Sequence, residues 1–308
     1  LLDVNADAKI NSISIGKGAN SVSGNTVLGE GALDASVSGG NNTAIGKDAL
    51  TQLTSGTDNV AVGRTSLDAD TTGSNNVAVG SNCLSSNTTG ADNTAIGRSA
   101  LAVSTTASNN TAVGRSALSA NTTGTQNTAV GAEALNTTTT GNQNSALGLA
   151  ALYANTTGSD NTALGRSALS ANTTASNNTA VGSSALLSNT TGTLNVAVGA
   201  FALDANTTAD ANTAVGTYAL TANTTGAENV AIGRQSLFSN TTANDNISIG
   251  VNTMYANTTG KRNVAAGSGA LGANTTADNN TAIGYLALND NTTGTDNVAV
   301  GANALDAN

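Results

Sequence analysis

The sequence predicts an all-β protein, a parallel β-solenoid, and two regular features indicate it. Asparagine recurs every 17 residues from Asn42 to Asn297, and glycine recurs at the same step from Gly46 to Gly301. The repeat reads N-[TV]-A-[VI]-G-x-x-[AS]-L-x-x-N-T-T-[GA]-x-x. A period held this strictly is typical of short units that stack on their neighbours. We therefore assign residues 25–308 to 17-residue coils of a solenoid, and residues 1–24 to an N-terminal junction with a short first coil.

The composition agrees with a thin core built by stacking. Aromatic residues are 2% of the 308 residues, and the chain has no histidine, tryptophan or proline. Large side chains therefore cannot fill a globular core. The net charge of −9 argues against a nucleic-acid partner, which requires a basic surface. No apolar run approaches 20 residues, so we expect no membrane insertion by this segment.

The first part of each repeat predicts a short strand. Thr43 and Ile45 lie two residues apart and so share one face of that strand, while Ala44 and Gly46 share the other. β-Branched residues suit a pleated strand. We expect the aliphatic columns of Ile45 and Leu50 to form the core. The small face at Ala44 and Gly46 is expected to lie close to a partner chain or a neighbouring layer.

The second part of each repeat predicts a turn, because Asn and Gly accept left-handed backbone conformations. Stacked coils would place identical asparagine side chains roughly 4.8 Å apart, where they can hydrogen-bond along the stack. If the threonines continue a strand, neighbours such as Thr122 and Thr123 point to opposite faces. One threonine per coil would then face outward.

No catalytic constellation is present, and we expect no enzyme activity, no cofactor and no metal site. The absence of histidine excludes histidine-based triads and histidine metal ligands. The carboxylates Asp68 and Asp70 occur as a pair in one coil only, which favours a solvated turn. Acidic residues often precede the repeat asparagine, but that column also holds Leu194 and Arg262, which argues against a calcium ladder. A column that starts at Lys47 is rich in arginine, and we weigh solubilising charge against an anion-binding stripe.

The segment Asn11-Ser12-Ile13-Ser14-Ile15-Gly16-Lys17-Gly18-Ala19 resembles the head repeats of trimeric autotransporter adhesins. Later units, such as Asn110-Thr111-Ala112-Val113-Gly114, are similar to the longer 17-residue variant of phage tail fibres and bacterial surface fibres. The resemblance covers roughly residues 11–308. It implies a left-handed β-roll, three chains in a homotrimeric rod, and an adhesive or spacer role. The chain departs from the adhesin head repeats by three extra residues per coil, which carry Asn-Thr-Thr.

Aromatic side chains are rare and mark the candidate ligand-binding residues. Phe201 and Tyr218 occupy one column in successive coils, and Phe238 and Tyr255 occupy another. The other residues of both columns are mostly polar, so these rings are expected to point outward. Exposed aromatic rings often contact carbohydrate or protein. Packing between coils or between trimer chains is the alternative explanation.

Together these features predict a non-enzymatic structural and adhesive fibre, part of a phage tail fibre or a bacterial surface adhesin. Its location would be extracellular, on a virion tail fibre or a bacterial cell surface. Its partners would be two further copies of itself and a host-cell surface glycan or protein. A hypothesis from a different class is an ice-binding β-solenoid that uses the repeated threonines. A single outward threonine per coil disfavours it, and a thermal-hysteresis assay separates the two.

Overall fold

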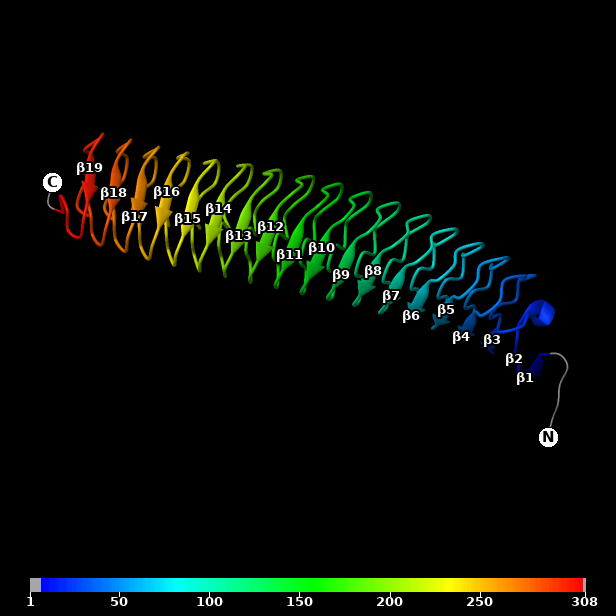
Figure 1. The fold of residues 1–308 in the computed structure, drawn as a ribbon. Coiled ribbons are helices and arrows are strands. Elements are labelled where there is room, and N and C mark those ends of the chain that lie inside the picture. The colour runs from blue at the N-terminus through cyan, green and yellow to red at the C-terminus, as the bar shows by residue number, and fades with distance from the viewer. Residues whose placement is uncertain (1–6, 307–308) are drawn as a thin grey trace. The chain divides into compact units, whose positions relative to one another are not determined.

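The computed structural model describes residues 7–306, and the chain divides into two compact units, 1–157 and 158–308. Each unit is a parallel β-solenoid in which successive coils place their strands side by side (Figure 1). The all-β solenoid of 17-residue coils that the sequence predicts is therefore confirmed. The first six residues of the expected junction, and residues 307–308, lie outside the described residues.

Three-residue strands form the regular part of both units. In unit 1 the elements are β1 (Ala8–Ile10), β2 (Ile13–Gly16), the 3-10 helix η1 (Ala19–Ser21), β3 (Thr26–Gly29), β4 (Thr43–Ile45), β5 (Val60–Val62), β6 (Val77–Val79), β7 (Thr94–Ile96), β8 (Thr111–Val113), β9 (Thr128–Val130) and β10 (Ser145–Leu147). In unit 2 they are β11 (Thr162–Leu164), β12 (Thr179–Val181), β13 (Val196–Val198), β14 (Thr213–Val215), β15 (Val230–Ile232), β16 (Ile247–Ile249), β17 (Val264–Ala266), β18 (Thr281–Ile283) and β19 (Val298–Val300). From β3 to β10, and from β11 to β19, neighbouring strands pair in parallel with a step of 17 residues.

The N-terminal segment does not form a parallel coil. Strand β2 runs antiparallel to β3, with Ser14 opposite Gly29, and β1 runs antiparallel to β2. Only residues 17–25 separate β2 from β3, whereas residues 46–59 separate β4 from β5. The shorter connection cannot complete the circuit of a regular coil, so the chain reverses direction instead. The short first coil that the sequence suggests is therefore replaced by an antiparallel segment, and the parallel stack begins at β3.

The structure reverses the expected orientation of the strand faces. Ala44 is fully buried inside its own coil, together with Ala49 and Leu50, while Thr43 and Ile45 are only half-buried on the outside. The prediction that the Ile45 column belongs to the core was wrong, and the alanine column cannot lie against a partner chain. The fully buried Leu50 column shares the coil interior with this strand face, which holds alanine in most coils, Val27 in β3 and Ser248 in β16.

Unusual backbone conformations close each coil. Gly46 has a φ of 125°, and a Cβ there would stand 2.6 Å from the carbonyl oxygen of Gly63 in the next coil, so only glycine fits. Leu50 has a φ of 52°, a left-handed conformation that costs a bulky residue roughly 1–2 kcal/mol. Burial of the whole leucine side chain contributes about 1.5–3 kcal/mol and offsets that cost. The Leu50 N–H also donates to the carbonyl of Ser66, 3.0 Å away in the next coil.

A column of buried asparagines precedes the strands, and it forms the ladder that the repeat predicts. At Asn59 the backbone N–H and the side-chain Nδ2 both donate to Asn42 Oδ1 of the previous coil, at 3.0 and 3.1 Å. Nδ2 also donates to the carbonyl of Gly73, at 2.8 Å. Both asparagines are fully buried. Each side chain thus links a coil to the coils before and after it, and we call this set the strand-side column.

A second buried column lies at the Asn-Thr-Thr corner, and we call it the corner column. Its members are Leu53, Asp70, Asn87, Ser104, Asn121, Thr138 and Asn155 in unit 1, and Asn172, Asn189, Asn206, Asn223, Asn240, Asn257, Asn274 and Asn291 in unit 2. In unit 2, Asn206 Nδ2 donates to Asn189 Oδ1 at 2.9 Å and to the carbonyl of Ala209 at 3.0 Å. The asparagine of the corner is therefore a structural residue.

Candidate functional site

The outer face of the strands carries an aliphatic column. It occupies the last position of each three-residue strand and holds valine, isoleucine or leucine except at Ala266. Leu147 in unit 1 and Ile249 in unit 2 are 51% and 42% exposed. Its members are Ile45, Val62, Val79, Ile96, Val113, Val130 and Leu147 in unit 1, and Leu164, Val181, Val198, Val215, Ile232, Ile249, Ala266, Ile283 and Val300 in unit 2. An ordered, partly exposed apolar stripe of this kind is a candidate interaction surface.

The four aromatic residues singled out in the sequence form two stacked pairs in unit 2. The ring centroids of Phe201 and Tyr218 lie 5.2 Å apart with 5° between the ring planes, and those of Phe238 and Tyr255 lie 5.0 Å apart, also at 5°. All four belong to the turns that follow the strands. Tyr218 and Tyr255 are exposed and both phenylalanines are half-buried, so the stacked rings of each pair are partly accessible to solvent.

The threonines of the Asn-Thr-Thr corner lie in a bend and not in a strand. Thr122 is half-buried, and its Oγ1 donates to the carbonyl of Thr139 in the next coil at 2.9 Å. Thr123 is exposed. The expectation that Thr122 and Thr123 lie on opposite faces of a strand was therefore wrong, because neither residue is in a strand. The column of Thr123 still offers one exposed threonine per coil, without interruption from Thr72 to Thr157 and from Thr174 to Thr293.

The carboxylates Asp68 and Asp70 do not form the solvated turn that the sequence suggests. Asp70 belongs to the corner column and is fully buried, and burial raises its pKa to about 7. Its Oδ1 accepts the backbone N–H of Gly73 at 2.9 Å. Asp68 is half-buried, and burial raises its pKa as well. No group of three histidine, cysteine or acidic residues able to hold a metal ion occurs among the described residues.

The arginine-rich column is exposed and partly neutralised by acidic neighbours. Arg115 contacts the carboxylate of Glu133 at 2.6 Å, and Lys47 lies 3.3 Å from that of Glu30. Exposed pairs of this kind contribute about 0–1 kcal/mol to stability. These partners make Lys47 and Arg115 less available to an anionic ligand.

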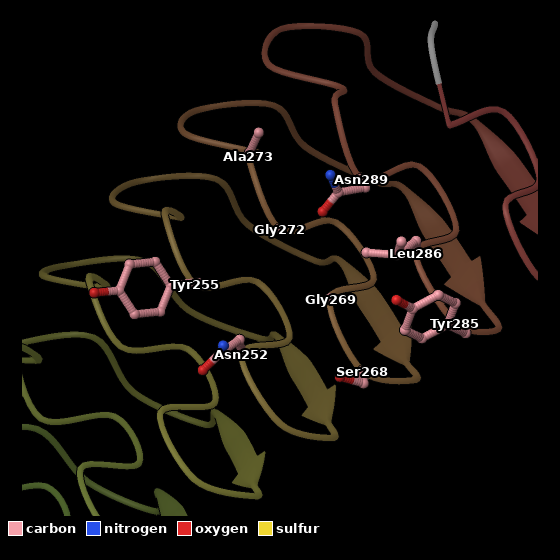
Figure 2. A pocket seen from close by; sticks show the side chains of 9 residues that line it. All are labelled: Asn252, Tyr255, Ser268, Gly269, Gly272, Ala273, Tyr285, Leu286 and Asn289. Carbon is pink, nitrogen blue, oxygen red and sulfur yellow. The ribbon is translucent and has the colours of Figure 1, made fainter.

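A notch of about 450 Å³ opens in the turns of unit 2, and sequence reasoning did not find it (Figure 2). Tyr255 and Tyr285 stand on opposite sides of Gly269 and Gly272, which form its floor. Asn289 belongs to the same coil as Tyr285, and its Oδ1 lies only 2.5 Å from the place where a Cβ on Gly272 would stand. The remaining residues around it are Asn252, Ser268, Ala273 and Leu286. None of these side chains is charged.

The sequence did contain the signal for this notch. Gly269 shares a column with Phe201, Tyr218 and Leu286. Gly272 shares a column with Phe238 and Tyr255, and most other members of both columns carry longer side chains than glycine. Two nearby glycines in one coil leave a gap into which Leu286 and Asn289 of the next coil extend without filling it.

Comparison with known proteins adds no family assignment, because neither a scan of protein-family models nor a search of curated proteins found a match to this chain. The structure also shows, among residues 7–306, no helix with the length and apolarity that a membrane crossing needs. Functional inference therefore depends on the outward-facing columns and on the notch.

Proposed function

We propose that this chain is a segment of a non-enzymatic extracellular fibre, of the phage tail-fibre or bacterial surface-adhesin type, that assembles as a parallel homotrimer. The observation that carries the proposal is the outward aliphatic column. Each coil adds one apolar side chain to it at a fixed step, and soluble monomers rarely leave such a stripe uncovered. Further copies of the same chain, aligned in the same direction, would present a matching stripe along their whole length.

Three copies is the number implied by the resemblance to the adhesin heads and tail fibres, as is a left-handed β-roll. The stacked aromatic pairs lie in turns, away from the strand face, so assembly through the aliphatic column is compatible with their exposure. A trimer would present each pair three times, and weak contacts with a host-cell surface glycan or protein would gain from multivalency. The fibre would act as a rigid spacer and a receptor-contact surface.

Light scattering tests the assembly. We expect a mass of three times 29.7 kDa for the wild-type chain. The double variant Ile232→Lys/Ile249→Lys places charges in the aliphatic column and should dissociate the trimer. Thr242→Lys/Thr259→Lys adds the same charges at exposed threonines of the same two coils, and should leave the mass unchanged. A wild-type monomer, or an equal response of both variants, would contradict the proposed interface.

Binding of the labelled protein to whole bacterial cells and to cultured epithelial cells tests the contact surface. Replacing Phe201, Tyr218, Phe238 and Tyr255 together by serine should leave the mass and the circular-dichroism spectrum unchanged. Attachment should fall sharply, because the exposed aromatic rings are gone. Undiminished attachment would leave the fibre with a spacer role only. Loss of the trimer would show instead that the rings pack against a neighbouring chain.

The ice-binding hypothesis remains a second candidate because of the exposed threonine column. Ice recognition requires a regular two-dimensional array, and the corner offers a single row of threonines. On the strand face, the position two residues away from Thr213 is Val215, so a second row of threonines is not formed there either. A thermal-hysteresis measurement decides this point, and detectable hysteresis at micromolar protein would favour the ice-binding class over the fibre.

A further inference from the structure

We infer that the notch between Tyr255 and Tyr285 is a binding site for a neutral sugar ring. The inference rests on the proposed function for its biological setting, and it names the ligand class and the residues of one contact site. Two glycines remove the side chains that fill this surface in other coils, which leaves a hollow bounded by aromatic rings and amides (Figure 2).

The chemistry of the notch fits a pyranose. A sugar ring presents C–H groups on its faces, which stack on aromatic rings, and hydroxyl groups around its edge, which need donors and acceptors. Tyr255 is 38% exposed and Tyr285 is 57% exposed, so both rings are available for stacking. The amides of Asn252 and Asn289 and the hydroxyl of Ser268 provide the polar partners.

The absence of charge around the notch favours an uncharged ligand. None of its nine residues is acidic or basic, so a phosphate or a sialic acid would find no counter-charge among them. Within residues 7–306 the side-chain amide of Asn252 makes no hydrogen bond. Asn289 uses Nδ2 to donate to Asp290 Oδ1 at 2.8 Å, and its own Oδ1 leans over Gly272 as an acceptor.

The notch also lies at one end of an aromatic platform. Phe238 stacks on Tyr255, and Tyr255 lines the notch, so an apolar surface leads directly to it. A volume of about 450 Å³ lies within the range of small-molecule sites and is sufficient for one or two sugar rings. A longer glycan could therefore place one ring in the notch and its neighbours on the platform.

Saturation-transfer NMR with the full chain tests this site directly. The probes are the methyl glycosides of glucose, galactose, mannose and N-acetylglucosamine, each uncharged. We expect transfer to at least one of them with the wild-type protein. Tyr255→Ser should weaken that binding about tenfold, which corresponds to the loss of one stacked ring worth about 1.4 kcal/mol. Tyr153→Ser is the control, because Tyr153 is 37% exposed in the same column but does not line this notch.

A second variant fills the notch with residues that the same columns already carry. Gly269→Asn copies Asn252, which has a φ of 55° where Gly269 has 69°, and Gly272→Thr copies Thr221. The added Cβ atoms would meet only the flexible side chains of Leu286 and Asn289 at under 3.0 Å, so the fold should persist. The double variant should abolish transfer. The inference is overturned if no probe shows transfer, or if transfer survives in the filled variant.

The outcomes separate this site from the proposed function. A protein that binds no probe and yet attaches to cells would refute the notch and leave the adhesive fibre standing. A protein that binds a probe through the notch and yet attaches to no cell surface would support the site and argue against adhesion.

Discussion

The corner column differs between the two units, and the difference shows how such a ladder stabilises a coil. In unit 2 the column is asparagine throughout, from Asn172 to Asn291. In unit 1 leucine, aspartate, serine and threonine interrupt it. The strand-side column, in contrast, is asparagine in every coil of both units. In the 17-residue coils from residue 42 onward, strands and turns fall at the same positions in both units, so the comparison concerns mainly the side chain at the corner.

In an asparagine ladder each side chain donates to the asparagine of one neighbouring coil and accepts from that of the other. A single replacement therefore also affects the neighbouring coils. In unit 2, Asn223 donates to Asn206 and accepts from Asn240. In unit 1, Ser104 and Thr138 occupy the next positions of the column after Asn87 and Asn121. The Oδ1 atoms of Asn87 and Asn121 have no hydrogen-bond partner within the described chain. A buried polar atom without a partner costs about 1–3 kcal/mol. Unit 1 should thus open more readily than unit 2 at its corners.

The largest expected effect comes from Asp70→Asn, which repairs one interruption and removes a buried acid. The pKa of Asp70 is raised from 3.8 to about 7, so the folded state holds the proton more tightly than the unfolded state does. Stability therefore falls as pH rises from about 4 to about 7 and is level above that. The variant should lose the part of this slope that Asp70 contributes, while Asp68 keeps its own raised pKa, and it should be more stable at pH 8 by at most about 4 kcal/mol. Below pH 4 the difference should nearly vanish.

Hydrogen exchange at the corner of residues 70–76, corrected for the intrinsic rate, measures this effect locally. Asp92→Asn is the matched control, because Asp92 is exposed in a neighbouring coil. A variant that keeps the wild-type slope between pH 4 and pH 7 would show that Asp70 is not the group responsible.

The reverse experiment breaks the ladder of unit 2. Asn223→Leu copies Leu53 of unit 1. It removes the partner of Asn206 Oδ1 and one of the two partners of Asn240 Nδ2 and of the Gly226 carbonyl. We expect a local loss of about 2–4 kcal/mol, because buried groups on both sides lose a bond. Exchange should accelerate in residues 206–243 and stay slow near Asn274. Equal protection in both regions would mean that the ladder adds little.

The smallest effect should come from Ser104→Asn, which extends the ladder of unit 1 by one step. The new amide would donate to Asn87 Oδ1 and to the carbonyl of Ala107, as Asn206 does to Asn189 and Ala209. A local gain of about 1–2 kcal/mol is expected. Ser55→Asn, at an exposed site, should change nothing. If both variants leave exchange at residues 87–107 unaltered, the open oxygen of Asn87 carries no cost.

Several features of the structure could be predicted from single columns of the sequence. The 17-residue step predicts the parallel pairing of Thr43 with Val60. The regular spacing of the asparagines predicts the hydrogen-bonded ladder between Asn42 and Asn59. Phe238 and Tyr255 occupy the same column in successive coils, which predicts that the two rings lie next to each other. The notch was not predicted, because Gly269 and Gly272 considered alone indicate only a coil of lower stability. Their meaning depends on Tyr285 and Asn289, which belong to the next coil.

The sequence by itself determined the period, the strand positions, the buried Leu50 column and the asparagine ladders, because each follows from a residue type repeated at one step. Only the tertiary structure decided which strand face is inside. Alternation allows either Ala44 or Ile45 to face the core. The interior of each regular coil already holds the buried Leu50 column and the two buried columns that are mostly asparagine, so the small face of the strand turns inward and the aliphatic column faces outward.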